Sequence, residues 1–179
     1  MHEDIVTEVI RQVMAERGVK LADNKVHNHQ GEHHCNGNCG HHKQMTLELA
    51  MKLMERVEAK AKELDMRIVT AVSDGAGRPV AVHCMDGAYI GSFDVAVNKT
   101  YTAVAFQMST AKLGELAAPG QSLYGIQFTN EGKIVIFGGG EPLYHGDRMI
   151  GAVGISGGSA EQDTYLAQYA VEQWNNLIK

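Results

Sequence analysis

The sequence predicts an α+β fold in which an antiparallel five-stranded sheet is flanked by helices. Beyond residue 45, apolar residues recur at helical spacing in some segments and form short runs of strand length in others. A tight glycine-containing turn at 74–77 joins the first two of these short runs, which is typical of an antiparallel hairpin. No strand–helix–strand unit carries the glycine pattern of a dinucleotide-binding fold. The segments therefore indicate hairpins with helices packed on the sheet.

The boundaries of the predicted elements rest on capping and turn signals. Thr46 can cap the first helix, whose apolar positions run from Leu47 to Leu64. Ser159 and Gln162 form a plausible capping box for the last helix. In chain order, we expect a helix over about 46–64, strands at 67–73 and 79–84, a helix over about 90–107, strands near 133–137, 142–145 and 148–156, and a helix ending near Ile178.

Composition excludes several classes of function. The net charge is −5 and no basic run is present, so binding to nucleic acid is not expected. The apolar stretches are far shorter than the ~20 residues that a membrane-spanning helix needs, and the acidic start does not resemble a secretory signal. Cys35, Cys39 and Cys84 are odd in number and suggest no disulfide framework. These features indicate a cytoplasmic protein without a membrane partner.

The first 44 residues differ in character from the rest of the chain. Residues 1–18 are predicted to form an amphipathic helix that stops at Gly18, and residues 19–44 a polar, flexible linker. The apolar stripe of the helix consists of Ile5, Val6, Val9, Ile10, Val13 and Met14. Such a stripe can pack on its own domain or across an oligomer interface, or it can dock into a partner's groove. Because a folding helix does not require so long a linker, we favour docking.

Four segments within residues 45–179 resemble the family that contains GlcG, HbpS and the carboxy-terminal domain of PduO. These segments are SDGAGRPVAVHCMDGA at 73–88, NKTYTAVAFQMST at 98–110, SLYGIQFTNEGKIVIFGGGEPL at 122–143 and MIGAVGISGGSAEQD at 149–163. The resemblance implies a profilin-like antiparallel five-stranded sheet with flanking helices. It also implies assembly into homo-oligomers, often octamers, and the binding of haem, which some members are proposed to degrade.

The resemblance to PduO in particular carries expectations about the setting of the protein. PduO genes lie among those for bacterial microcompartments, and the short helix with its linker resembles the encapsulation peptides of such compartments. We therefore expect a location inside a microcompartment, with residues 3–17 contacting a shell or cargo protein. The adenosyltransferase domain of PduO has no counterpart in this chain, so that activity is not expected here.

His83 is the candidate ligand to haem iron. A neutral imidazole is a common haem ligand, and strand alternation places His83 opposite Val82 and Cys84. A solvent-facing histidine at the end of a strand is the alternative. Cys84 is expected to act as a small buried hydrophobe, and His145 to lie in an exposed loop. Met85 and Met108 are possible soft ligands that packing explains equally well.

A second group of candidates could hold an anionic part of the cofactor. Lys99 and Arg78 can pair with a haem propionate; Lys99 can also meet a buried carboxylate or reach to the surface. The amides of two glycine-rich turns can cradle an anion, although tight turns alone also explain the glycines. These glycines are Gly139, Gly140, Gly157 and Gly158.

The linker concentrates side chains that bind transition metals. Its ligands are His27, His29, His33, His34, Cys35, Cys39, His41 and His42. Cys35 and Cys39 with their neighbouring histidines can reach tetrahedral geometry around zinc, but the segment lacks the apolar residues that build a zinc finger. Two interpretations stay open: an incidentally metal-binding linker, or an arm that captures metal or haem.

Taken together, the sequence favours a non-catalytic or weakly catalytic haem-binding protein of a microcompartment, which supports redox or cofactor handling, possibly of cobalamin. Two alternatives belong to other classes. One is an enzyme that degrades haem or acts on a small organic acid at the glycine-rich turns and Lys99. The other is an adaptor that binds the compartment shell.

Overall fold

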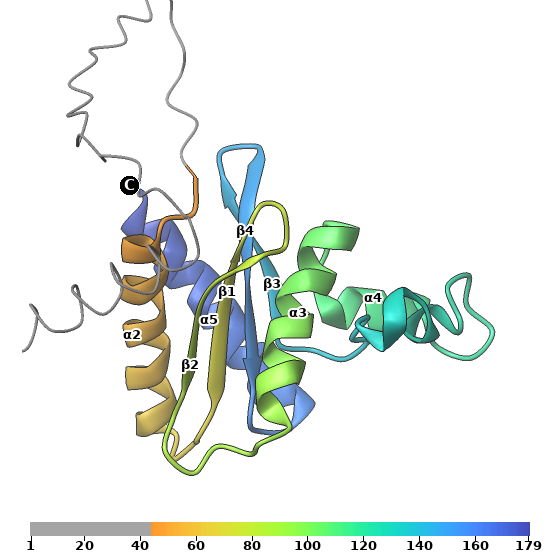
Figure 1. The fold of residues 1–179 in the computed structure, drawn as a ribbon, viewed down its shortest axis with the longest axis horizontal. Helices are drawn as coiled ribbons and strands as arrows, with labels where there is room; N and C mark the ends of the chain where they lie inside the picture. Colours follow the sequence, from red (N-terminus) through yellow and green to blue (C-terminus); the bar gives the residue numbers. More distant parts are fainter. Residues whose placement is uncertain (1–43) are drawn as a thin grey trace, which may run out of the picture. The chain divides into compact units, whose positions relative to one another are not determined.

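The computed structural model describes residues 44–179, so the predicted helix at 1–18 and all but the last residue of the predicted linker lie outside the described residues. The described part contains four strands and four α-helices (Figure 1). The elements are α2 (Leu47–Glu63), β1 (Val69–Asp74), β2 (Pro79–Cys84), α3 (Ser92–Phe106), α4 (Thr110–Leu116), the short 3₁₀ turns η1 (Ile126–Phe128) and η2 (Asn130–Gly132), β3 (Gly140–His145), β4 (Arg148–Ser156) and α5 (Ala160–Leu177).

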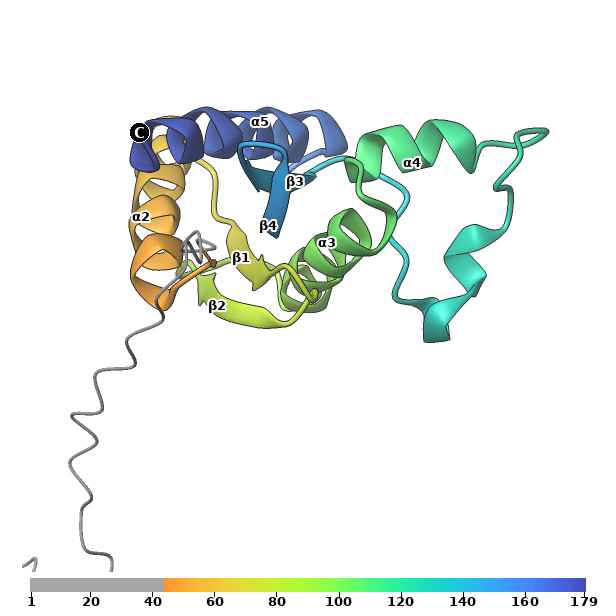
Figure 2. The same ribbon diagram turned by 90° about the horizontal axis from the view of Figure 1, so that it is seen from above.

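The four strands form one antiparallel sheet in the order β2-β1-β4-β3. Helix α3 packs on one face of this sheet, and α2 and α5 pack on the other, as Figure 2 shows. Both faces are therefore covered by helices, and β2 and β3 are the edge strands. This arrangement confirms the predicted α+β class.

Alternation along β1 divides the core between the two faces. Val69 and Ala71 pack with Ala96 under α3, whereas Val72 belongs to the larger cluster under α2 and α5. Trp174 of α5 lies fully buried in that larger cluster, and its indole N–H donates to the carbonyl of Tyr144 at 2.7 Å. A hydrogen bond of this kind lets a large aromatic ring be buried without an unpaired polar group.

The structure confirms both predicted helix caps. The Thr46 hydroxyl accepts from the amide of Leu49, and Ser159 and Gln162 form the reciprocal capping box. Each cap satisfies an amide that the first turn of a helix leaves without a partner. The two longest helices, α2 and α5, are thus fixed at their amino ends.

The prediction of five strands was wrong, because residues 133–137 do not join the sheet. Ile134 and Val135 are buried, as their apolar character indicated. The amide of Val135 donates to the Thr102 hydroxyl of α3 at 3.0 Å instead of to a neighbouring strand. The segment therefore buries Ile134 and Val135, and this amide bonds to a helix instead of to a strand. The next strand of the sheet, β3, begins at Gly140.

Helix α4 was not predicted. It is seven residues long and is capped by Ser109, whose hydroxyl accepts from the amide of Lys112. Residues 117–133 follow it and extend away from the sheet (Figures 1 and 2). Tyr124 and Phe128 in this extension are 66% and 81% exposed.

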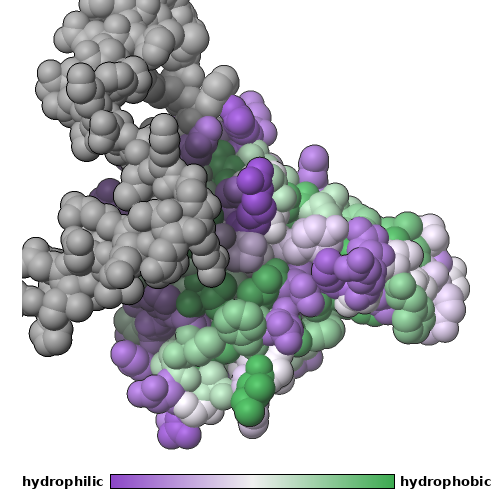
Figure 3. Space-filling model, in the orientation of Figure 1, coloured by the Kyte–Doolittle hydropathy of each residue, from purple (hydrophilic) through white to green (hydrophobic). Residues whose placement is uncertain are grey.

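The surface of the α3 side carries a second group of exposed apolar residues. Figure 3 shows apolar surface at the lower end of this face, where the chain passes from β2 to α3. Tyr89, Ile90 and Phe93 in and beside this connection are all exposed. No helix between residues 44 and 179 has the length and apolar character needed to cross a membrane.

Candidate functional site

His83 lies near the end of the edge strand β2 and faces α2. It is directly opposite Thr70 in the β1–β2 register, and its Nδ1 lies 2.6 Å from Oε1 of Glu58 on α2. The side chain of His83 is 31% exposed and that of Glu58 20% exposed. An Nδ1–H that donates to Glu58 leaves Nε2 with its lone pair, as a metal ligand requires. His83 thus faces away from Val82, as alternation predicted.

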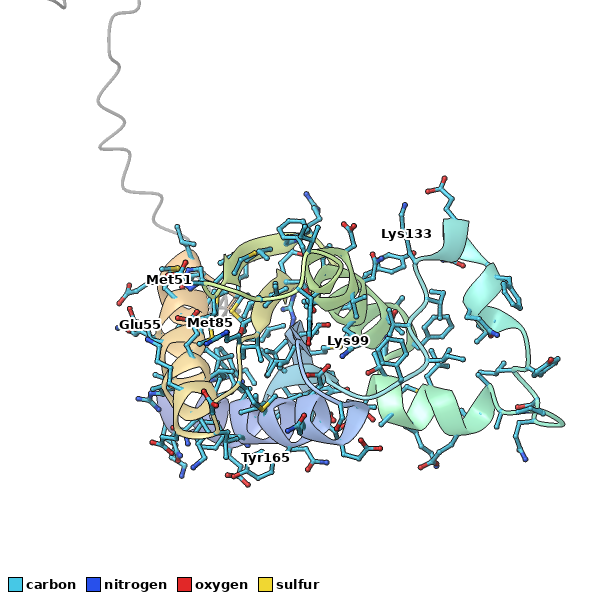
Figure 4. All side chains as sticks on the ribbon, turned by 90° about the horizontal axis from the view of Figure 1, so that it is seen from below. Met51, Glu55, Met85, Lys99, Lys133 and Tyr165 are labelled. Carbon is cyan, nitrogen blue, oxygen red and sulfur yellow. The ribbon has the colours of Figure 1, made fainter. Side chains whose placement is uncertain are left out.

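The surface around His83 contains two adjoining depressions. The smaller has a volume of about 280 Å³ and is lined by Glu58, Val82, His83, Cys84 and Met85. The larger, of about 450 Å³, shares Glu58, Cys84 and Met85 with the first, so the two are continuous at these residues. Figure 4 shows Met85 beside α2, and its side chain packs partly buried against the core.

The chemistry of these depressions suits an amphipathic, iron-containing group. The smaller one offers an imidazole nitrogen with apolar and sulfur-containing neighbours. The larger one is lined by two cations that can pair with carboxylates, Lys62 and Arg67. Three carboxylates, those of Glu58, Asp65 and Asp86, line it as well. We name Glu58, His83, Met85, Lys62 and Arg67 the edge site. Its donor set fits haem, with a nitrogen ligand on one side and cations for propionates on the other.

A buried ion pair lies elsewhere, beneath α3. Lys99 is completely buried, and its ammonium donates to Asp163 Oδ2 at 2.8 Å and to the carbonyl of Ile155 at 2.6 Å. The ring of Phe137 lies 4.9 Å from the Lys99 nitrogen. Burial lowers the pKa of Lys99, and the charge and hydrogen bond of Asp163 oppose this effect. Figure 4 shows Lys99 pointing into the interior.

The predicted glycines surround this ion pair. A Cβ on Gly139 would lie 2.7 Å from the Lys99 nitrogen, and one on Gly140 would lie 3.0 Å from the Lys99 Cβ. The amide of Gly158 donates to Asp163 Oδ1 at 2.9 Å, and Gly157 precedes it at the end of β4. The two glycine-rich turns therefore enclose the side chains of Lys99 on α3 and Asp163 on α5.

The structure thus brings together Lys99 and the four glycines, but around a carboxylate of the chain itself. Of the alternatives for Lys99, the structure shows pairing with a buried carboxylate. The amide of Gly158, expected to face an external anion, is taken by Asp163. The geometry gives this cluster a structural role that joins α3, β4 and α5.

The remaining candidates lie apart from this cluster. Arg78 stands at the opposite end of β2 from His83, in the β1–β2 turn. Cys84 is exposed rather than buried, which corrects the expectation of a small core residue. Its position at the end of an edge strand explains the exposure. The linker ligands from His27 to His42 lie outside the described residues, and residues 44–179 contain no group of three potential metal ligands.

Sequence reasoning missed two residues that define these sites, Glu58 and Asp163. Glu58 is one of several acidic residues on α2, and its partner lies 25 positions away across the packing of helix on strand. Asp163 is 64 positions from Lys99. No local pattern distinguishes either carboxylate from an ordinary surface acid.

Comparisons with known proteins agree with this architecture. The family model described as haem degrading protein HbpS-like matches residues 45–172. A 15.0 kDa protein from the dhaT-dhaS intergenic region of Citrobacter freundii is 43% identical over 133 residues, which make up 74% of this chain and 94% of that protein.

Two further comparisons involve PduO. The corrinoid adenosyltransferase PduO of Salmonella typhimurium is 38% identical over 116 residues, which make up 65% of this chain and 34% of PduO. The chain therefore spans about a third of the length of that relative. A crystal structure of the PduOC:heme complex superposes with a TM-score of 0.70 at 34% identity, covering 73% of this chain and 94% of that one.

Proposed function

The chain belongs to the HbpS-like family, and from this premise we propose that it binds haem at the edge site with His83 as the iron ligand. The observation that carries the proposal is the 2.6 Å contact between His83 Nδ1 and Glu58. A carboxylate in this position fixes the ring and its tautomer and makes Nε2 more basic. The similarity to a domain whose structure was solved with haem supports the same ligand.

Each residue of the edge site has a role in this proposal. His83 holds the iron, and Glu58 orients the imidazole. Met85, together with the neighbouring Val82, shields the apolar part of the ligand from water. Lys62 and Arg67 attract its carboxylates. Bound haem supplies a metal centre that can exchange electrons, which suits a part in redox or cofactor handling.

We propose the biological setting on the strength of the resemblance to PduO. The relative from Salmonella typhimurium is named as a corrinoid adenosyltransferase, which supports a role beside cobalamin chemistry. In this proposal the protein is a homo-oligomer inside a bacterial microcompartment, with residues 3–17 docked on a shell or cargo protein. Zinc or another metal at the linker histidines and cysteines remains a separate expectation.

A haemin titration followed at the Soret band tests haem binding. We expect a saturable change at one haem per chain. The same titration with His33, His34, His41 and His42 all changed to alanine separates the edge site from the linker. Retention of the stoichiometric spectrum in that variant supports the edge site, whereas its loss contradicts the proposal.

Glu58→Gln is expected to weaken haem binding by about tenfold, because outer partners of a metal-bound histidine typically contribute 10–100-fold to affinity. The amide keeps the size of the side chain but removes its charge. Glu55→Gln, at an exposed position one turn earlier on α2, is the matched control. Haemin titrations of both variants measure the effect. Equal affinities in the two variants would show that Glu58 does not support the ligand.

A further inference from the structure

A third hollow lies at the opposite end of the sheet from His83. It has a volume of about 360 Å³ and is lined by the β1–β2 turn, the start of β4 and the residues that lead into α2. Figure 1 shows that the two hairpin turns and the start of α2 share this end of the sheet. Arg78 and His83 are five residues apart on an extended strand, so their backbones are about 16 Å apart. The hollow is therefore separate from the edge site.

Two arginines from different hairpins line this hollow, Arg78 and Arg148. Among the residues that the structure describes, Asp74 is the only acidic one in its lining. One oxygen of Asp74 already accepts from the amides of Ala76 and Arg78 within the turn. Its other oxygen lies 3.9 Å from Nε of Arg78, too far for a hydrogen bond, and the Arg78 side chain is 81% exposed. Asp74 therefore leaves the guanidinium N–H groups of Arg78 available to a ligand.

The guanidinium of Arg148 is likewise available to a ligand. Within residues 44–179, no carboxylate forms an ion pair with Arg148 and no side-chain hydrogen bond involves its guanidinium. Two guanidinium groups and one carboxylate leave the hollow with a formal charge of +1. This balance suits a ligand with a single negative charge, and guanidinium groups bind a planar carboxylate with paired hydrogen bonds.

Apart from the polar Gln44, the other side chains that line the hollow are apolar. Met45 and Ile150 are almost completely buried, and Val80 and Met149 are half-buried beside them. A volume near 360 Å³ is at the lower end of the range for small-molecule sites. The hollow therefore combines cations for a carboxylate with apolar walls for a short aliphatic body.

We propose that Arg78 and Arg148 bind the carboxylate of a small aliphatic monocarboxylic acid in this hollow, with its carbon chain against Met45, Val80 and Ile150. The site is independent of haem. This anion site differs from the one predicted from the sequence at Lys99, because the ammonium of Lys99 already pairs with Asp163 within the fold. Arg78 is again assigned to an anion, but here it acts with Arg148 and binds a small carboxylic acid instead of a haem propionate.

Calorimetric titration of the full-length protein with propionate tests the site, and propionamide serves as the uncharged ligand of nearly the same shape. We expect saturable binding of propionate and none of propionamide. Arg78→Gln and Arg148→Gln should each weaken propionate binding by about tenfold, which corresponds to one charge-assisted contact. Lys112→Gln, which removes a positive charge on α4, should leave it unchanged.

Three outcomes would overturn the proposal: no saturable binding of propionate, equal affinity for propionamide, or equal affinity of the Arg148→Gln and Lys112→Gln variants. Inorganic phosphate binding more tightly than propionate would also contradict the charge balance. Haemin titration of Arg148→Gln separates this test from that of the edge site, because its Soret change should match that of the unchanged protein. Both arginines are exposed, so the variants are expected to keep the fold.

Discussion

Lys99→Met is expected to lower the free energy of unfolding by about 3–5 kcal/mol, because it leaves the carboxylate of Asp163 buried without its cation. Both side chains are almost completely inaccessible, at 0% and 4% exposure, so water cannot replace the lost partner. Methionine keeps the length and the apolar stem of the lysine. Equilibrium unfolding in urea at fixed protein concentration measures the change.

Two comparisons make this result specific to the ion pair. Lys112→Met breaks an exposed pair with Glu115 and should cost less than about 1 kcal/mol. The double variant Lys99→Met with Asp163→Asn removes both charges but keeps an oxygen for the amide of Gly158. It should be more stable than Lys99→Met alone. If the two substitutions instead destabilise additively, Lys99 and Asp163 are not coupled.

Gly139→Ala is expected to destabilise the protein by about 3 kcal/mol or more, through two separate effects. Gly139 has a φ of +107°, which an L-residue adopts only with strain. The added Cβ would also lie 2.7 Å from the Ile155 carbonyl and 2.8 Å from the Asp163 Cβ, so the packed ion pair has to move.

Gly146→Ala distinguishes the cost of backbone strain from the cost of a steric clash. Gly146 also has a positive φ, of +59°, but a Cβ there would meet nothing within 4 Å. Its cost should be that of backbone strain alone, about 1 kcal/mol. Urea unfolding of the two variants gives the difference. Equal costs would show that the close approach of Gly139 to the ion pair does not matter for stability.

The sequence predicted the elements whose signals are local. Thr46 and Ser159 cap helices through contacts within three residues, and the β1–β2 hairpin follows from its own turn. Residues 133–137 carry the apolar pattern of a strand, yet Thr102 of α3 accepts the hydrogen bond that a neighbouring strand would have taken. Helix α4 is short and contains a glycine, so the spacing of its apolar residues does not identify it as a helix.

In the candidate sites, too, the sequence predicted the residues with local signals and missed those brought in from distant parts of the chain. Alternation predicted the direction of His83, but the Glu58 carboxylate that orients its ring comes from another element. The sequence identified Lys99 and the four glycines without the Asp163 that makes them a structural unit. In each case the missing residue is a carboxylate whose partner is distant in the chain, and only the packing of helix against sheet selects it.

We propose that His83 binds the haem iron. Haemin titration of His83→Ala, with His145→Ala as the matched control at the end of the other edge strand, tests it most directly. We expect the saturable Soret spectrum to persist in His145→Ala and to be lost in His83→Ala. An unchanged spectrum and affinity in His83→Ala would contradict the claim and show that another residue holds the iron.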